Sequence, residues 1–456
     1  MAKAFNREVF ETMPVPAAVR QFVIPALAST LITIIYSLAD TIFVGMMKDP
    51  NQVAGLTVAF PYYQFLNAFS SLWGIGANSV MSRALGEKRF DRVSKASCFG
   101  FWCSAVFMLC ICALFACLQR PLLMATGASS NTYAHASGYL LWTFLVGGIP
   151  TVLSIVLSNL LRAEGHAKQA SSGLMLGGLL NCVLDPVFIF PLHMGVIGAG
   201  IATMLSNIVC LVYLLLVYAK LRATSYITLK PFAYRIEWPI VGKMVLVGLP
   251  SCCLTLLGAT GCIIQTALYS SYSDIAVAAW GVVNRISFIG IYATHGVAQG
   301  VLPLIGYNFG AKNFQRVRAV NRHAFAILMI IAFALLALSE IFSAGIVRVF
   351  INDAETIRVG TSLMRCYMLC TPFMSTILLV STLCQAVGKW QYSLIMLSIR
   401  QLVFNIPLML LLNRMIGILG VALGQPTCDF ICLFLAIFVY RFCFVRKMRP
   451  DGPVSA

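Results

Sequence analysis

Twelve long apolar segments constrain how this chain can fold. Each is close to or longer than the roughly 20 residues that a helix needs to cross about 30 Å of hydrocarbon. Only 10% of the residues are charged, against about 25% in a soluble domain. A backbone in lipid must pair its own polar groups, so we predict transmembrane helices. They cover residues 20–46, 53–80, 96–118, 136–161, 171–191, 195–219, 241–269, 277–305, 321–343, 360–386, 392–413 and 417–440.

The basic residues predict the orientation of these helices. The net charge is +17, and most Lys and Arg fall in short loops between the apolar segments. If both ends of the chain are cytoplasmic, the cytoplasmic segments hold 24 Lys and Arg and the opposite segments hold 6. Cytoplasmic loops carry such an excess, so we predict that both termini are cytoplasmic. The charge thus reports topology, and we expect no nucleic-acid partner.

The sequence repeats itself at an offset of about 224 residues, a feature that is typical of transporters. GEKRFDRV at 86–93 returns as GAKNFQRV at 310–317, and VAGLTV at 53–58 returns as VAAWGV at 277–282. Since each half holds an even number of helices, the halves share one orientation. We predict an all-α integral membrane protein of two six-helix bundles. A pseudo-two-fold axis along the membrane normal relates them, with a cavity between.

The repeat and the loop charges also predict the domain boundaries. We expect an N-terminal six-helix half at 1–219, a basic cytoplasmic linker at 220–240, a C-terminal half at 241–445 and a cytoplasmic tail at 446–456.

Acidic residues inside the predicted helices are the main candidates for function. A charge near the bilayer centre costs about 2.5–3.5 kcal/mol even on a mild scale. Asp40, Asp185 and Asp429 lie deep in their segments. The only Lys or Arg deep in any segment, Arg285 and Arg400, belong to the C-terminal half. Asp40 and Asp185 therefore have no basic partner in their own half.

The residues around Asp185 suggest a cation site. Asn181 precedes Asp185 by one helical turn, so the two side chains share a face. Pro186 removes a backbone hydrogen bond and tends to bend the helix there. With Asp40 and Thr203, these residues supply two carboxylates, an amide oxygen and a hydroxyl, which suit a hard cation such as Na⁺. They also suit protons, because two nearby carboxylates do not both remain ionised cheaply.

Together these features resemble the multidrug and toxic compound extrusion (MATE) transporters, in particular the prokaryotic DinF/MepA-like branch with its cation site in the N-terminal half. IPALASTLITIIYSLADTIFVG at 24–45, the paired GEKRFDRV and GAKNFQRV loops and LRAEGHAKQA at 161–170 carry the similarity, which covers nearly the whole chain. The resemblance implies a secondary antiporter in the bacterial cytoplasmic (inner) membrane. Such a protein exports cationic or lipophilic drugs and toxins in exchange for Na⁺ or H⁺ by alternating access.

The resemblance also assigns roles to residues. It places the Na⁺ or H⁺ site at Asp40, Asn181, Asp185 and Thr203, and a bend of the first helix at Pro25. Substrate-cavity candidates, each of which could instead serve ordinary helix packing, are Tyr36, Asn67, Asn159, Met175 and Met204. The expected partners are small organic cations, the coupling ion and the lipid bilayer, with no other cofactor, and the expected state is a monomer.

Another branch of the family has an acidic site in the C-terminal half, and this sequence departs from it. The repeat aligns Asp40 near Gln265, and the Asp185–Pro186 pair near Ile406–Pro407. These counterparts are neutral, so we predict that coupling resides in the N-terminal half.

Several alternatives stay open. A flippase for lipid-linked or polysaccharide substrates would have the same architecture but would need a large cationic groove. An intramembrane enzyme would need an Asp-rich Mg²⁺ motif or a His–Asp set, and the sequence contains neither. Asp429 could couple transport or serve local packing. We interpret Glu340 as a solvated interfacial acid, His295 as a hydrogen-bonded packing residue, and Arg285 as closing a polar contact near a helix end.

Overall fold

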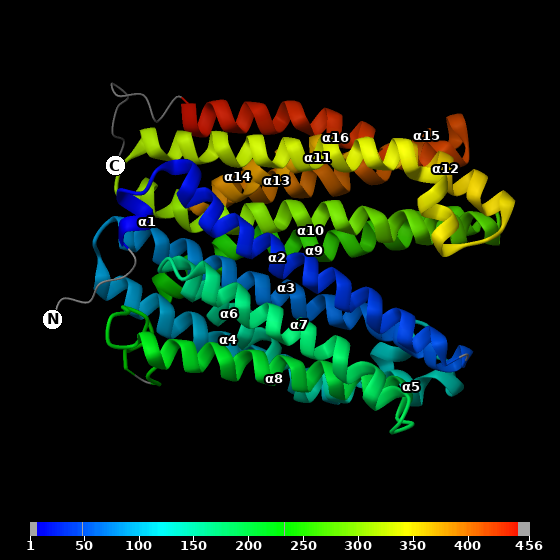
Figure 1. Ribbon diagram of the computed structural model, residues 1–456, viewed down its shortest axis with the longest axis horizontal. Coiled ribbons are helices and arrows are strands. Elements are labelled where there is room, and N and C mark those ends of the chain that lie inside the picture. Colours follow the sequence, from blue (N-terminus) through cyan, green and yellow to red (C-terminus); the bar gives the residue numbers. More distant parts are fainter. Residues whose placement is uncertain (1–6, 48, 232, 446–456) are drawn as a thin grey trace.

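The computed structural model describes residues 7–47, 49–231 and 233–445, so the predicted tail at 446–456 lies outside the described residues. Those ranges form α-helices and π-helical segments (η), and the longest connection joins α8 to α9 (Figure 1). The elements are α1 (Arg7–Glu11), α2 (Val15–Met46), α3 (Pro50–Gly86), α4 (Phe90–Ala125), α5 (Ser130–Leu140), η1 (Leu141–Val146), α6 (Gly148–Ala163), α7 (Ala167–Ile189), α8 (Gly195–Leu221), α9 (Trp238–Ser270), α10 (Asp274–Gly310), α11 (Phe314–Phe350), α12 (Ala354–Met368), α13 (Thr371–Ala386), α14 (Trp390–Ser398), η2 (Ile399–Asn405), α15 (Ile406–Ile416), α16 (Ile418–Tyr440) and η3 (Arg441–Val445).

The predicted apolar segments coincide with helical structure. In the described part of the chain, nine helices are long and apolar enough to cross a membrane, and two bent helix pairs raise this to eleven. α3 accounts for the remaining segment: its 37 residues are long enough to span, but it is less apolar. It packs against α4, α6, α9 and α10, so little of its surface needs to match lipid. The chain is therefore an all-α membrane protein.

The helices form two groups, which Figure 1 shows on opposite sides of the molecule. We call α2–α8 the N-terminal helices and α9–α16 the C-terminal helices. α1 and the end of α16 lie at one end of the bundle, the α1 end, whereas α5 and α12 lie at the other, the α12 end (Figure 1). The ribbons of the two groups lie close together at the α1 end and farther apart toward the α12 end.

Near the α1 end the two groups touch backbone to backbone. A Cβ added to Gly76 on α3 would collide with the carbonyl of Met244 on α9. A Cβ added to Gly248 on α9 would collide with the carbonyl of Leu72 on α3. Small residues permit this close approach of membrane helices. The contact is reciprocal, since each helix contributes one glycine and one carbonyl.

The repeated motifs cross in the same way. α3 ends at Gly86 and α10 ends at Gly310, which are the first residues of the two motif copies. A Cβ on Gly86 would collide with the carbonyl of Tyr307, and one on Gly310 with the carbonyl of Arg83. The two copies thus contact each other through equivalent residues, as a pseudo-two-fold axis between them requires.

We expect Gly248→Val to destabilise the protein by about 1–3 kcal/mol, because the new side chain would force α9 away from the Leu72 carbonyl. The measurement is the melting temperature of the purified protein in detergent. Gly242→Val on the same helix is the matched control, since a Cβ there meets no atom within 4 Å. Equal melting temperatures for the two variants would contradict this account of the crossing.

The segment that joins α8 to α9 is tied to the N-terminal helices. Glu164, which follows α6, is 0% exposed. Its Oε1 accepts hydrogen bonds from the backbone amides of Tyr226 (2.7 Å) and Ile227 (3.1 Å), and its Oε2 accepts one from Ser225 Oγ (2.5 Å). Ser94 Oγ on α4 donates to the carbonyl of Tyr226 at 2.8 Å. One buried carboxylate therefore holds the start of this connection in place.

We expect Glu164→Ala to release residues 225–230, because three donors would lose a charged acceptor at a cost of about 1–3 kcal/mol each. Limited trypsin digestion should then cleave at Lys230 or Arg235 faster than in the wild type. Glu355→Ala, at an exposed position on α12, is the control. Unchanged cleavage kinetics in Glu164→Ala would mean that Glu164 does not hold the segment.

Candidate functional site

Three of the four predicted cation-site residues meet between α7 and α8. Asp185 on α7 is 0% exposed. Asn181, one turn earlier, donates from Nδ2 to Asp185 Oδ1 (3.1 Å) and to Thr203 Oγ1 on α8 (3.3 Å). The helical spacing of Asn181 and Asp185 builds the first contact, and the packing of α7 on α8 builds the second.

Asp40 approaches this group from α2. α2 packs along α7, and Tyr36, one turn before Asp40, lies against Gly178. A Cβ on Gly178 would lie 3.1 Å from the Tyr36 ring, so the glycine allows the two helices to come close. Asp40 is near enough to Asp185 for their charges to interact.

These residues present oxygen atoms that no protein donor satisfies. Within the described residues, Oδ1 of Asp40, Oδ2 of Asp185 and Oδ1 of Asn181 are buried and lack a hydrogen-bond partner. No ion pair in that part of the chain involves either aspartate. Buried polar atoms are almost always paired, so this group calls for an occupant. Because all three atoms are oxygen acceptors, they fit a hard cation or protons on the carboxyl groups.

A cluster of tyrosines surrounds Asp40, and the sequence pointed to only one of them. The hydroxyl of Tyr36 lies 3.1 Å from that of Tyr63 on α3. Tyr139 on α5 is near enough to Asp40 for the two groups to interact electrostatically. Tyr292 on α10 is near enough to Tyr36 for the same kind of interaction. Tyr292 belongs to the C-terminal helices, so the cluster joins both groups. No spacing relative to an acid marked the other three tyrosines in the sequence.

The remaining cavity candidates lie among the N-terminal helices, and two of them are buried in packing. Asn159 packs against Gly74 and accepts a hydrogen bond from Asn78 Nδ2 at 3.4 Å. Met204 is buried beside Gly147. Asn67 donates to Gln64 at 3.3 Å, and Met175 is partly buried. Among the hydrogen bonds of the described residues, none joins these four candidates to either carboxylate.

Both predicted helix-bending prolines lie inside helices. Pro25 lies within α2, which runs unbroken from Val15 to Met46. Pro186 directly follows Asp185, and α7 continues to Ile189. Both prolines therefore lie within continuous helices.

In contrast, the acid of the C-terminal helices is neutralised. Asp429 on α16 is 0% exposed and binds Arg400 on η2 through two parallel bonds, Nε to Oδ1 (2.6 Å) and Nη2 to Oδ2 (3.1 Å). Gln425 Nε2 adds a third bond at 3.1 Å. Bidentate pairs of this kind are strong and specific. Of the two roles left open for Asp429, the geometry favours packing.

Three other residues, Glu340, Arg285 and His295, had roles predicted from the sequence. Glu340 is half-exposed and lies 3.9 Å from Arg365 Nε, which agrees with a solvated acid. Arg285 is exposed and forms no hydrogen bond or ion pair with the described residues, so the polar contact that we expected is wrong. The hydrogen bond expected for His295 is likewise missing from this part of the chain.

The MatE family model matches the chain over residues 25–187 and again over residues 250–411. The chain belongs to the MATE family. The two matches begin 225 residues apart, at residues 25 and 250, which agrees with the internal repeat. This MATE protein is a membrane transporter and not an enzyme.

Relatives of this MATE transporter include named multidrug exporters. It is 26% identical over 434 residues to "Multidrug export protein MepA" of Staphylococcus aureus (strain NCTC 8325 / PS 47) and 25% identical over 431 residues to the protein of that name from Staphylococcus haemolyticus (strain JCSC1435). Each comparison covers 94% of both chains. The fold matches a solved multidrug resistance MATE family transporter of the MOP superfamily in an outward-facing conformation, with TM-score 0.91, 22% identity, and 98% and 99% coverage of the two chains.

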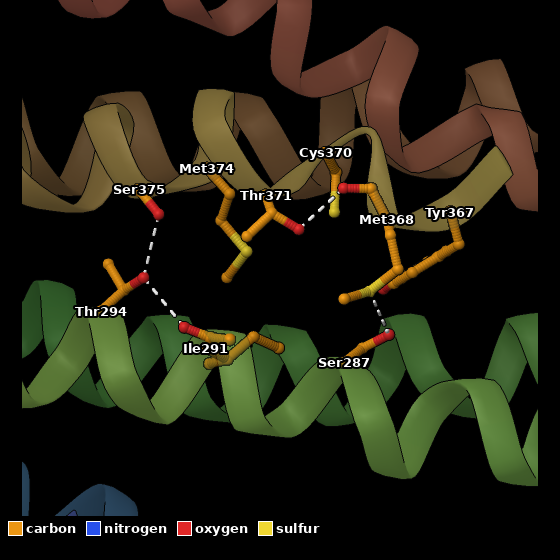
Figure 2. Close-up of a pocket in the computed structure, with 10 residues that line it drawn as sticks. Ser287, Ile291, Thr294, Tyr367, Met368, Cys370, Thr371, Met374 and Ser375 are labelled. Carbon is orange, nitrogen blue, oxygen red and sulfur yellow. Dashed lines mark hydrogen bonds between the residues drawn. The ribbon is translucent and has the colours of Figure 1, made fainter. Parts of the chain in front are cut away.

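The C-terminal helices of the transporter also hold a crevice, and its lining residues Tyr367 and Cys370 are near enough to Asp429 to interact with it electrostatically. Figure 2 shows its lining between α10 and the break from α12 to α13. Thr294 Oγ1 lies 3.0 Å from Ser375 Oγ, and Thr371 Oγ1 donates to the carbonyl of Met368 at 2.7 Å. Its lining holds no carboxylate, and these hydroxyls are already paired. We therefore interpret the crevice as a packing feature of the bent helix.

Proposed function

We propose that this MATE transporter exports cationic or lipophilic organic molecules in exchange for Na⁺ or H⁺. The coupling ion binds among Asp40, Asn181, Asp185 and Thr203. The observation that carries the proposal is the group of three unpaired buried oxygen atoms. The printed name of the MepA relatives, multidrug export protein, supports the substrate class.

Two features of α2 support coupling between the ion and the substrate. α2 carries Asp40, and it packs both on α7 in its own group and on α10 in the other. Tyr36 and Tyr63 lie beside the carboxylates and offer aromatic faces to an organic cation. A ligand shifts an equilibrium only by its differential affinity for the two states, so ion and substrate must favour different positions of α2.

The proposal includes orientation and state. The halves are 1–219 and 241–445, joined by the 220–240 linker, and the α1 end faces the cytoplasm of a bacterium. The excess of Lys and Arg in the loops of that end supports this orientation. The closed α1 end, with its glycine crossings, corresponds to an outward-facing form of a monomer.

The test is dye transport by the purified protein in proteoliposomes. Ethidium movement is followed while either a Na⁺ gradient at equal pH or a pH gradient without Na⁺ is imposed. We expect one of the two gradients to drive accumulation against the ethidium gradient, and an ionophore for that ion to abolish it. Ethidium flux that neither gradient drives would refute antiport and leave only a facilitated pathway.

The alternative of a flippase for anionic lipid-linked substrates receives no support from the site. Such a protein needs free cationic side chains in its groove. Arg400, one of the two intramembrane arginines, is fully bound by Asp429, and the other, Arg285, lies exposed on α10.

A further inference from the structure

The C-terminal helices contain a buried cluster of three amides between α9 and η2. Asn405 Nδ2 donates to Gln401 Oε1 at 3.3 Å. A Cβ on Gly261 of α9 would collide with Gln401 Nε2 and lie 3.7 Å from Asn405 Nδ2, so both amides lie directly on the α9 backbone. Gln265 lies one turn beyond Gly261 on the same face of α9. α9 and η2 both run toward the α12 end. Gln265 therefore lies beyond Gly261 in the same direction in which Asn405 lies beyond Gln401.

Two polar atoms of this cluster have no partner among the described residues. They are Nε2 of Gln265 and Oδ1 of Asn405, and their side chains are 4% and 2% exposed. One is a donor and the other an acceptor. Buried amides that stay unpaired are rare, so the pair indicates an occupant that both accepts and donates a hydrogen bond.

The cluster occupies the place that the repeat relates to the cation site. Gln265 is the counterpart of Asp40. The Gln401–Asn405 pair has the same four-residue spacing as Asn181–Asp185, although its hydrogen bond runs from the second residue to the first and the repeat aligns Asp185 with the next residue, Ile406. The π-helical segment η2 spans Ile399–Asn405 and ends at this pair, and such segments often accompany functional sites. The cluster thus lies close to the place of the cation site in the other half, but an amide stands at the position of Asp40 and no acid stands at the position of Asp185.

The charge of the cluster decides the class of its ligand. It holds no carboxylate, and the nearest charged groups on η2 and α16, Arg400 and Asp429, neutralise each other. A cation would therefore gain no counter-charge there, and the unpaired N–H of Gln265 would repel it. The surface of α9 beside the cluster is open, since a Cβ on Gly258 meets no atom within 4 Å.

We propose that Gln265 and Asn405 bind an uncharged hydrogen-bonding group of a transported molecule, such as a carboxamide. This inference rests on the proposed export function. The N-terminal carboxylates would then recognise the ion, while the equivalent place in the C-terminal helices recognises a neutral part of the substrate.

The experiment compares two probes that differ in one group. Tetraphenylphosphonium has no hydrogen-bonding group, whereas (carbamoylmethyl)triphenylphosphonium carries a carboxamide on a similar cation. Equilibrium binding of each is measured to the purified full-length protein and to Gln265→Met and Asn405→Leu, which keep side-chain volume. Thr266→Val is the matched control, because its hydroxyl bonds only to its own helix, at Cys262.

We expect Gln265→Met and Asn405→Leu each to weaken carboxamide binding by about five- to tenfold. Tetraphenylphosphonium binding should change less than twofold, and Thr266→Val should change neither. If both probes weaken equally, or neither weakens, the cluster holds only water or serves packing, and the inference is overturned. If the wild type binds both probes but transports neither, the proposed function fails, while the binding comparison still decides the role of the cluster.

Discussion

Replacing Asp185 by asparagine should abolish export driven by the cation gradient while the fold stays intact. The asparagine oxygen can still accept the hydrogen bond from Asn181, but the negative charge is lost. Coupling between two ligands is worth about 1–3 kcal/mol, or roughly 5–150-fold in affinity, and this linkage should disappear. The measurement is gradient-driven ethidium accumulation in proteoliposomes, with the melting temperature recorded on the same preparation.

Asp49→Asn is the matched control for this prediction. Asp49 caps α3 by accepting hydrogen bonds from the Asn51 amide and from Gln52, and asparagine caps helices equally well. This variant should therefore accumulate ethidium as the wild type does. If Asp185→Asn and Asp40→Asn both kept full gradient-driven accumulation, neither carboxylate would carry the coupling.

Asp429→Asn should destabilise the protein by about 3–5 kcal/mol, which is the typical cost of leaving a buried charge without its partner. Arg400 is nine-tenths buried or more, and Asp429 supplies both acceptors of its two strongest hydrogen bonds. Thermal unfolding in detergent measures the effect. The same acid-to-amide change thus affects transport at Asp185 and stability at Asp429.

The double variant Arg400→Met with Asp429→Leu separates a structural pair from a functional one. Apolar residues of similar volume often replace a buried ion pair at no cost in stability. We expect this variant to regain most of the stability lost in Asp429→Asn and to keep cation-driven transport. A stable double variant without transport would assign Asp429 to the coupling machinery instead.

Much of the fold follows from hydropathy, because a helix in lipid must pair its backbone within itself. Hydropathy does not predict where each helix begins and ends. α4 begins at Phe90, before the predicted segment at 96–118, and ends at Ala125, since a helix can continue into water beyond the hydrocarbon. The break between α12 and α13 within the predicted segment at 360–386 lies directly before Pro372, in the first turn of α13, a signal that hydropathy alone does not use.

In the candidate site, too, the sequence predicts contacts within one helix but not contacts between helices. Helical spacing predicts that Asn181 and Asp185 share a face, and their hydrogen bond agrees with this. Spacing says nothing about which side chains meet across helices. Arg400 and Asp429 are 29 residues apart in the chain, and Tyr292 reaches the tyrosine cluster from the other group of helices. Such contacts depend on the packing of the whole bundle.

Direct ion binding tests the central claim, which is that two carboxylates without a basic partner hold a mobile cation. Purified protein in weakly buffered detergent solution receives either ²²Na⁺ or a small acid pulse, and bound ²²Na⁺ and the protons taken up are measured. The account predicts that the wild type binds Na⁺ or takes up protons that the double variant Asp40→Asn with Asp185→Asn does not. Equal Na⁺ binding and equal proton uptake in the double variant would contradict it.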